Sequence, residues 1–317
     1  MNVIYHCHGG AHSSVMAAAI HTGRVTAPST LSIGEVMALP YFDIQDDDEL
    51  GAVRSVGVDY AGNRVYVMGR DRFSVLVERL FSSLSRLVGI DRSSYILSDA
   101  LRYVNPLMVV GGTLSRRFRM VSLGRRIAAE GTRRAAPYLA GAVAFVEKRI
   151  QDLAKASVCV GPERFNKVVV FHCYGRGQTA LLAAACYAGL LHPQCPDRHD
   201  RFLPDTVFKH FGRLVPGAAQ SIGSDREGNL VVAVGLGCAN RLLARSARDF
   251  LEVSGIAPDR IVLQDTSEAN SIWFDVAHTL ATAEPTAPVG RALRASIWSA
   301  KRDDIWRLAS RARSAST

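Results

Sequence analysis

The segment VIYHCHGGAHSS (residues 3–14) decides how this sequence is interpreted. Its apolar, β-prone start predicts a short buried strand over Asn2–Cys7. Gly9 and Gly10 then allow a tight turn of the backbone. The Ala-rich run Ser13–Thr22 predicts a helix, because serine is a favourable capping residue at a helix start. The segment is therefore expected to form a strand, a glycine-containing loop and a helix.

The same pattern recurs 166 residues later, where VVFHC (169–173) aligns with VIYHC (3–7). The alignment continues without a gap at Ala17–Ala19 with Ala183–Ala185, Gly23 with Gly189, Gly57 and Asp59 with Gly223 and Asp225, Gly62–Asn63 with Gly228–Asn229, Gly69 with Gly235, Gly89–Ile90 with Gly255–Ile256, and Asp99 with Asp265. So many glycines and aspartates in one register predict a duplication of one structural unit.

Each unit is expected to continue with a β-hairpin, a helix and a further strand. In the first unit the hairpin is predicted at Val53–Val58 with Val65–Met68, the helix at Arg72–Val88 and the strand at Tyr95–Leu97. The second unit is predicted to begin with a strand at Lys167–His172 and a helix at Thr179–Ala188. Its hairpin is then expected at Gln220–Val234, its next helix at Ala239–Val253 and its last strand at Arg260–Leu263. Alternating strands and helices predict an α/β fold, here tandem three-layer α/β units with P-loop-like strand–loop–helix starts and a β-hairpin insertion. We expect the two halves to pack as an internal pseudo-dimer.

The predicted domains are 1–150, a first unit with an arginine-rich extension and a helix near Ala135–Arg149, and 166–280, a second, degenerate unit. Residues 281–317 are expected to form a linker, Ala281–Val289, and a basic C-terminal helix. That helix either docks on the body of the protein or binds a partner or surface.

The composition is that of a soluble protein, with 48% hydrophobic and 21% charged residues. No stretch reaches the roughly 18 apolar residues needed for a membrane span. The six cysteines include no CxxC pair, so reduced thiols are expected. These features favour a cytoplasmic protein.

The net charge of +9 is concentrated in one cluster of arginines. Its members are Arg116, Arg117, Arg119, Arg125, Arg126, Arg133 and Arg134, against a single Glu130. Guanidinium groups suit bidentate contacts with phosphate or carboxylate. Arg116 and Arg117 are expected to reach an anion bound at the carboxyl ends of the strands, or else to form a solvated helix face. A nucleic-acid site is unlikely from the sequence, since no recognised motif or interleaved aromatic residues accompany the cluster.

The loop at residues 6–14 has the features of an anion site. Free N–H groups at a helix start favour negative charge, and Ser13 and Ser14 add hydroxyl donors. The second copy, with Gly177, Gln178 and Thr179, follows a Walker A frame whose lysine is missing, which disfavours a nucleoside triphosphatase. A purely structural tight turn remains the alternative.

The residues of this loop also suggest two other chemistries, a cysteine-based phosphatase and a zinc site. Cysteine-based phosphatases use C-x5-R, but the sixth residue after Cys7 is Ser13, so an arginine would have to come from elsewhere. His6, Cys7, His8 and His12 are all possible zinc ligands. No metal site is predicted, however, because neighbours on a strand point to opposite faces.

The first half resembles an uncharacterised family, found mainly in spore-forming Gram-positive bacteria, whose members open with H-C-Y-G-G-x-H-S-S. The resemblance lies in His6–Ser14, Ala17–His21, Leu39–Asp43, Gly57 and Asp59, Gly62–Tyr66, Gly111–Arg117, Gly124–Arg125 and Gly131–Thr132. It covers roughly residues 1–150; the second half matches in outline, with Arg176 and Gln178 in place of Gly10 and His12. The resemblance implies a domain of unknown function, with a link to sporulation as one possible role.

The sequence therefore predicts that the first unit binds a phosphorylated or otherwise anionic small molecule. The predicted binding residues are Gly9, Gly10, Ser13, Ser14, Arg116 and Arg117. If the protein is an enzyme, phosphoryl transfer or phosphate-ester hydrolysis is expected, with Cys7 or His12 as the reactive group and Asp99 as the base. The alternative is a ligand-binding or scaffold protein without turnover. The sequence identifies no cofactor.

Overall fold

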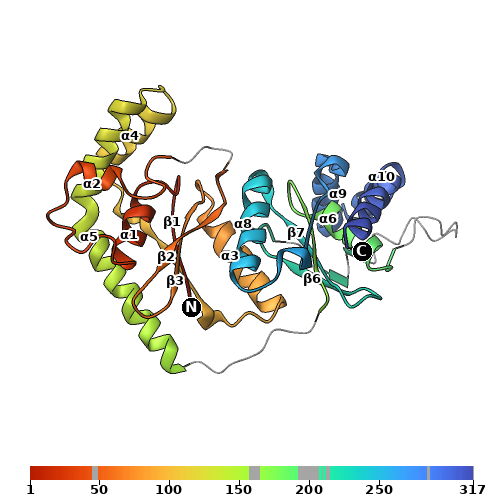
Figure 1. Ribbon diagram of the computed structural model, residues 1–317. Helices are drawn as coiled ribbons and strands as arrows, with labels where there is room; N and C mark the ends of the chain where they lie inside the picture. The colour runs from red at the N-terminus through yellow and green to blue at the C-terminus, as the bar shows by residue number, and fades with distance from the viewer. Residues whose placement is uncertain are drawn as a thin grey trace. The chain divides into compact units, whose positions relative to one another are not determined.

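The computed structural model describes residues 1–44, 49–156, 165–191, 207–208, 210–211, 215–283 and 286–316. Its contacts divide the chain into two compact units, Met1–Ser74 with Ile90–Gly161 and Val75–Gly89 with Pro162–Thr317. Each unit contains one four-stranded sheet covered by helices (Figure 1). The predicted tandem α/β organisation is confirmed.

The two sheets have the same strand order. In the first unit it is β2 (Val53–Val58), β3 (Arg64–Gly69), β1 (Asn2–Cys7) and β4 (Tyr95–Asp99). Strand β1 is parallel to both of its neighbours, and β2 is the antiparallel edge. The predicted hairpin is β2–β3, and its second strand pairs with β1, so the hairpin forms one side of the sheet.

The second sheet repeats this arrangement with β6 (Gln220–Ser224), β7 (Leu230–Gly235), β5 (Val168–Cys173) and β8 (Ile261–Asp265). The connecting turns explain several of the repeated residues. Asp59 accepts hydrogen bonds from the backbone N–H groups of Ala61 and Asn63 at 2.9 and 2.8 Å. Asp225 accepts the equivalent bonds in the second turn, both at 2.9 Å.

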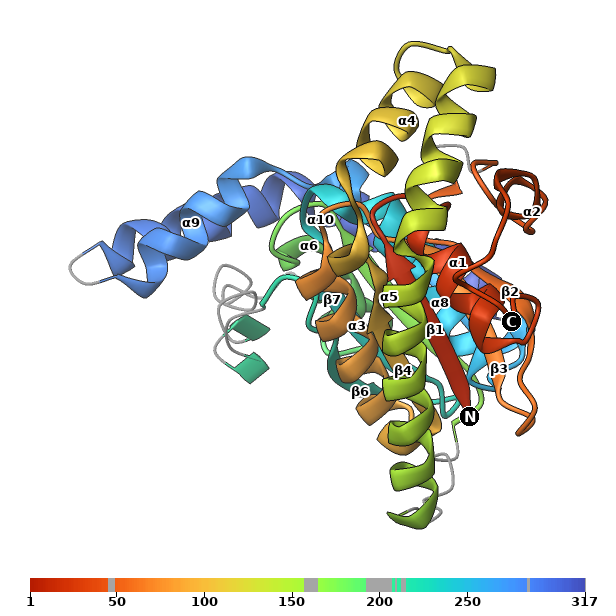
Figure 2. The same ribbon diagram turned by 90° about the vertical axis from the view of Figure 1, so that its left-hand side faces the viewer.

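In the first unit an Ala-rich helix lies directly on the sheet, and a longer helix packs against it. Helix α1 (Ser13–His21) packs on β1 and β3 with almost every residue buried, and α5 (Val121–Ala156) packs along α1. The predicted arginine-rich extension is a helical hairpin of α4 (Pro106–Arg116) and α5, which Figure 2 shows side by side. A short helix, α2 (Ile33–Met37), also contacts α5.

In the second unit, α6 (Gln178–Tyr187) packs on β5 and β7, and α8 (Asn240–Val253) lies on the opposite face of the sheet (Figure 1). Helix α3 (Ser74–Leu87) groups with this unit from Val75 onwards, and its Phe81 stacks on Phe250 of α8 with ring centroids 4.1 Å apart. Across the described parts of the chain, no helix combines the length and the apolar character needed to cross a membrane.

The C-terminal region differs from the predicted linker and tail. Helices α9 (Ile272–Thr282) and α10 (Ala287–Ser316) begin 166 residues after α4 and α5, respectively. Most of the predicted linker Ala281–Val289 therefore belongs to the ends of these helices. Three large side chains of the basic tail, Trp298, Ile305 and Leu308, are buried in the core of the second unit. The tail thus docks on the body, as one of the two interpretations predicted.

Candidate anion-binding site

The loop after β1 is organised around the Cys7 sulfur. The strand ends at Cys7, and Gly10, with φ +67°, turns the chain back so that its N–H donates to Cys7 Sγ at 3.1 Å. The Ser14 hydroxyl lies 3.2 Å from the same sulfur. Glycine is favoured at this turn because a side chain at positive φ is strained. Gly10 and Ser14 therefore both contact the Cys7 sulfur.

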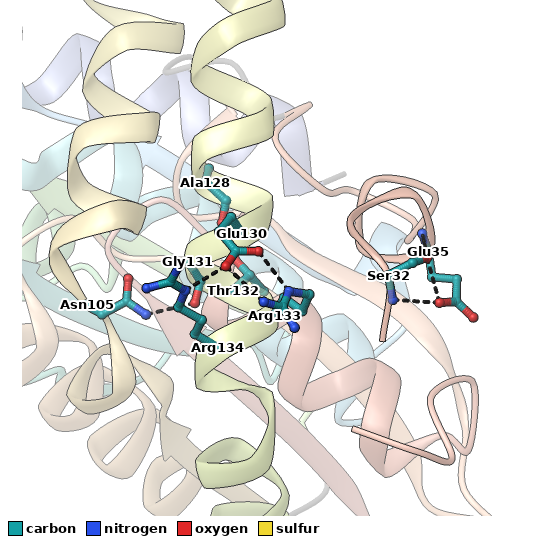
Figure 3. A network of polar contacts seen from close by, with 9 residues as sticks. All are labelled: Ser32, Glu35, Asn105, Ala128, Glu130, Gly131, Thr132, Arg133 and Arg134. Carbon is teal, nitrogen blue, oxygen red and sulfur yellow. Dashed lines mark hydrogen bonds and ion pairs between the residues drawn. The ribbon is translucent and has the colours of Figure 1, made fainter. Parts of the chain in front are cut away.

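Helix α4 crosses over this loop because glycines let it touch α5. A methyl group at Gly111 would lie 2.3 Å from Ala128 N, and one at Gly124 would lie 2.4 Å from Ser115 N. At the start of α4, Asn105 accepts a hydrogen bond from Met108 N at 3.1 Å. It also donates to the Gly131 carbonyl of α5 at 2.7 Å, as Figure 3 shows. Gly111, Gly124 and Asn105 therefore determine how α4 packs against α5.

A cavity of about 380 Å³ separates the loop from α4 and the turn before it. Its lining is partly polar and partly apolar, and α4 contributes residues of both kinds. The polar lining residues include Cys7, His8, His12, Ser13, Thr113, Arg116 and Arg117, and the apolar ones, here called the apolar wall, include Leu101, Val104, Met108 and Val109. Its volume is within the range of small-molecule sites.

Ser13 is the one polar side chain of the described cavity wall that is fully buried and has no hydrogen-bond partner. Its residue is 0% exposed, and Oγ makes no hydrogen bond. Ser13 is also the first residue of α1, where His12 provides no side-chain cap. Buried hydroxyl groups are normally satisfied, so an orphan at a helix start indicates that something else supplies the partner.

Arg116 and Arg117, two of the predicted binding residues, both line the cavity. Both terminal nitrogens of Arg116 lie 2.7 Å from the place where a methyl group on Gly9 would be. The guanidinium therefore rests on the loop, and a side chain at position 9 would displace it.

Other arginines of the cluster have structural partners. Arg133 and Arg134 both bind Glu130, at 2.7 and 2.6 Å, and Figure 3 shows the three on one stretch of α5. In the same view Thr132 bonds back to the Ala128 carbonyl, and Ser32 and Glu35 form the capping box of α2. Arg125 donates to the Met37 carbonyl at 2.9 Å. Part of the basic cluster therefore holds helices together.

The structure adds Asp43, which the sequence prediction missed as a functional residue. Its carboxylate, with 1% of the side chain exposed, lies 3.0 Å from His12 Nε2 and accepts a hydrogen bond from Ser115 Oγ at 2.9 Å. These two partners and Arg116 lower its pKa, although burial opposes them. Asp43 also has φ +54°, a conformation that costs energy and is common at functional sites. The available signal was its place at the end of the LPYFD motif.

Asp99 is not brought to the cavity wall. Its carboxylate accepts two hydrogen bonds from Arg70, both 3.1 Å, and caps the short helix η3 (Ala100–Tyr103) through Leu101 N. Arg70 also donates to His6 Nδ1 at 2.9 Å. Burial lowers the pKa of His6 to about 4, which Asp99 opposes and Arg70 reinforces. These three residues form a buried network beside the sheet edge.

Metal ligands do not gather in this region. No group of three or more histidine, cysteine and acidic residues with the geometry for a metal ion occurs among the residues that the structure describes. His8 pairs with Asp71 at 2.9 Å, and His6 faces Arg70, so the histidines point to different partners.

Comparison with known proteins gives a family but no described activity. No curated protein and no solved structure is significantly similar to the chain. One family model matches twice, over residues 2–148 and 168–314, which confirms the duplication and includes α9 and α10 in the second copy. The chain therefore belongs to the family of proteins of unknown function DUF3189 and contains two copies of its domain.

Proposed function

We propose that the first unit binds a phosphorylated small molecule in the cavity between the loop at residues 6–14 and α4. The observation that carries this proposal is the unpartnered, buried Ser13 hydroxyl at the start of α1. A helix start favours negative charge, and a phosphoryl oxygen would supply the missing acceptor. Arg116, resting on Gly9, would neutralise the charge.

The apolar wall specifies the rest of the ligand. Leu101 of η3, Val104 just after it and Met108 of α4 all line the cavity. A free inorganic anion would leave this wall in contact with water. The ligand class that suits both kinds of lining residue is an anionic head joined to a neutral or apolar body.

Titration with inorganic phosphate, followed by thermal unfolding and calorimetry, tests the proposal. Arg116→Ala is expected to weaken binding roughly 30-fold, about 2 kcal/mol, because a charge-assisted contact is lost. Ser13→Ala is expected to weaken it about fivefold. Arg126→Ala removes an equal charge from the exposed face of α5 and serves as the control. Equal binding by Arg116→Ala and Arg126→Ala would refute the site.

A further inference from the structure

We propose that the first unit hydrolyses phosphate monoesters, with Cys7 as the nucleophile and a cysteinyl phosphate as the intermediate. This inference rests on the proposed phosphate site and adds a reaction to it. Three groups that such a reaction needs line one cavity: the Cys7 thiol, the His12 imidazole and the Arg116 guanidinium. Two of them come from the loop at residues 6–14, and the third comes from α4.

Cys7 is held in the manner of a nucleophile. Gly10 N donates to its sulfur at 3.1 Å, and the Ser14 hydroxyl is 3.2 Å away. A backbone N–H directed at sulfur stabilises negative charge on it, the Ser14 hydroxyl can donate as well once the thiol has lost its proton, and the thiolate is the reactive form of cysteine. Cys7 lines the same cavity as Ser13 and Arg116, the residues proposed to bind the phosphoryl group.

Arg116 supplies the guanidinium that the loop itself lacks. The sixth residue after Cys7 is Ser13, so no loop arginine can bind the phosphoryl oxygens. The glycine at position 9 lets a guanidinium from α4 occupy the space above the loop. Positive charge fixed at this position stabilises the transferring phosphoryl group.

His12 is placed to move the protons. Its Nε2 is 3.0 Å from the buried carboxylate of Asp43, which fixes the ring. Its other edge faces α4, because a methyl group on Gly112 would lie 3.3 Å from Cε1 and 3.9 Å from Nδ1. Asp43 occupies Nε2, so Nδ1 is the nitrogen left for a bound ester. Asp43 and Ser115 are positioning residues, since they act through His12.

The reaction balances in two steps. The Cys7 thiolate forms a bond to phosphorus, the bond from phosphorus to the ester oxygen breaks, and His12 gives its proton to the departing alcohol. A water molecule then attacks phosphorus while His12 takes its proton, and the sulfur–phosphorus bond breaks to regenerate the thiolate. The products are one alcohol and one phosphate.

The test uses the full chain and p-nitrophenyl phosphate, whose aromatic ring suits the apolar wall. Cys7→Ser is expected to reduce hydrolysis by roughly 1000-fold while inorganic phosphate still binds within about threefold. The equivalent cysteine of the second unit provides the matched control, so Cys173→Ser should hydrolyse the ester like the wild type. His12→Gln, which introduces the residue found in the second copy, is expected to slow hydrolysis roughly 100-fold.

Acid-quenched wild-type protein gives a second readout that does not depend on a variant that folds. Mass spectrometry of its peptides should locate one phosphoryl group on Cys7 during turnover. Phosphate binding without hydrolysis or phosphocysteine would overturn this inference and leave the proposed site intact. Hydrolysis that survives Cys7→Ser would remove Cys7 from the nucleophilic role. Loss of phosphate binding in the wild type would overturn both proposals.

Discussion

The two units share a backbone plan but differ in what faces the loop after the first strand. In the first unit, Leu101, Val104 and Val109 line an open cavity. The positions 166 residues later are Ser267, Asn270 and Asp275, all polar. Ser267 Oγ accepts a hydrogen bond from Tyr174 N at 2.9 Å, and Asn270 donates to the Tyr174 carbonyl at 2.5 Å. In the second unit the loop is therefore hydrogen-bonded to the segment after the last strand, whereas in the first unit the equivalent segment lines the cavity.

The Ser13 hydroxyl of the first unit has no hydrogen-bond partner, whereas the equivalent hydroxyl of the second unit has one. Thr179 occupies the position equivalent to Ser13, and its hydroxyl lies 3.5 Å from that of Thr266 and also bonds Cys173. Cys173 is completely buried, and burial raises the pKa of its thiol, although hydrogen bonds from Thr179 and from the backbone of Ala180 and Gly177 oppose it. A cysteine in such surroundings stays a neutral thiol. The second copy keeps the cysteine as a core residue.

The charge that faces the loop is reversed between the units. Arg116 rests on Gly9 in the first unit, whereas a methyl group on the equivalent Gly175 would lie 3.2 Å from Asp275 Oδ2. Asp275 also bonds Gln178 and has a raised pKa, chiefly through burial, which Arg176 and Gln178 oppose. A carboxylate of the chain therefore lies against the second loop where a guanidinium lies against the first. The two units keep the same frame, whereas substitutions in the loop, in the turn after the last strand and on the helix that follows change the groups that face the loop.

The largest expected effect comes from transferring that carboxylate. Val109→Asp is expected to weaken phosphate binding by the first unit roughly 1000-fold, because like charges about 4 Å apart cost about 4 kcal/mol at an effective dielectric constant of 20. Calorimetric titration measures this loss. Val109→Asn, which has nearly the same shape without the charge, is the control. An equal loss in both variants would mean that shape, and not charge, separates the two units.

The buried histidines provide a comparison based on pH. Burial lowers the pKa of His6 to about 4 and also lowers the pKa of His172, which Asn240 and Asp265 oppose. In the unfolded chain a histidine titrates near 6.5. Between pH 6.5 and 4 the unfolded state therefore binds more protons, and the free energy of unfolding falls as the pH falls. The full His6 contribution, about 3 kcal/mol, is present above pH 6.5.

Denaturant unfolding between pH 4 and 8 measures this contribution. His6→Gln cannot titrate and should flatten the pH dependence of the first unit. All three tryptophans, Trp273, Trp298 and Trp306, lie in the second unit, so their fluorescence reports that unit, whereas circular dichroism reports both. An unchanged pH dependence of the circular dichroism transition in His6→Gln would contradict the assignment.

Much of the fold follows from the sequence because it depends on local patterns. Strands, hairpin turns and the helices α1, α3, α6 and α8 were predicted within a few residues, since apolar periodicity and glycine positions determine them. Helices α9 and α10 were missed as repeat elements. Their counterparts in the first unit are recognisable only by register, because almost every surface residue differs, and Pro288 and the threonines near Ala281 suggested a linker.

The site was predictable in part for the same reason. Cys7, His12, Ser13, Arg116 and Arg117 line one cavity, and the strand–loop–helix pattern and the basic cluster that single them out are local signals in the sequence. Asp43 was missed because its role depends on a contact over 31 positions of the chain, which no local pattern encodes. Asp99 was expected at the same edge of the sheet, and it is there, but Arg70 draws its side chain into a different network.

The smallest effect concerns the glycine beneath Arg116. The backbone at Gly9 is not in the left-handed region, so Gly9→Ala is compatible with the loop, and the new methyl group meets only the movable end of Arg116. Phosphate binding is expected to weaken about threefold to tenfold, as one charge-assisted contact is displaced but not deleted. Thermal unfolding without phosphate should change little.

At Gly10, with φ +67°, alanine should instead lower stability by about 1 kcal/mol, because there the backbone itself is strained. If both alanine variants lost stability equally, the small residue at position 9 would serve the turn, and Arg116 would not need the space above it.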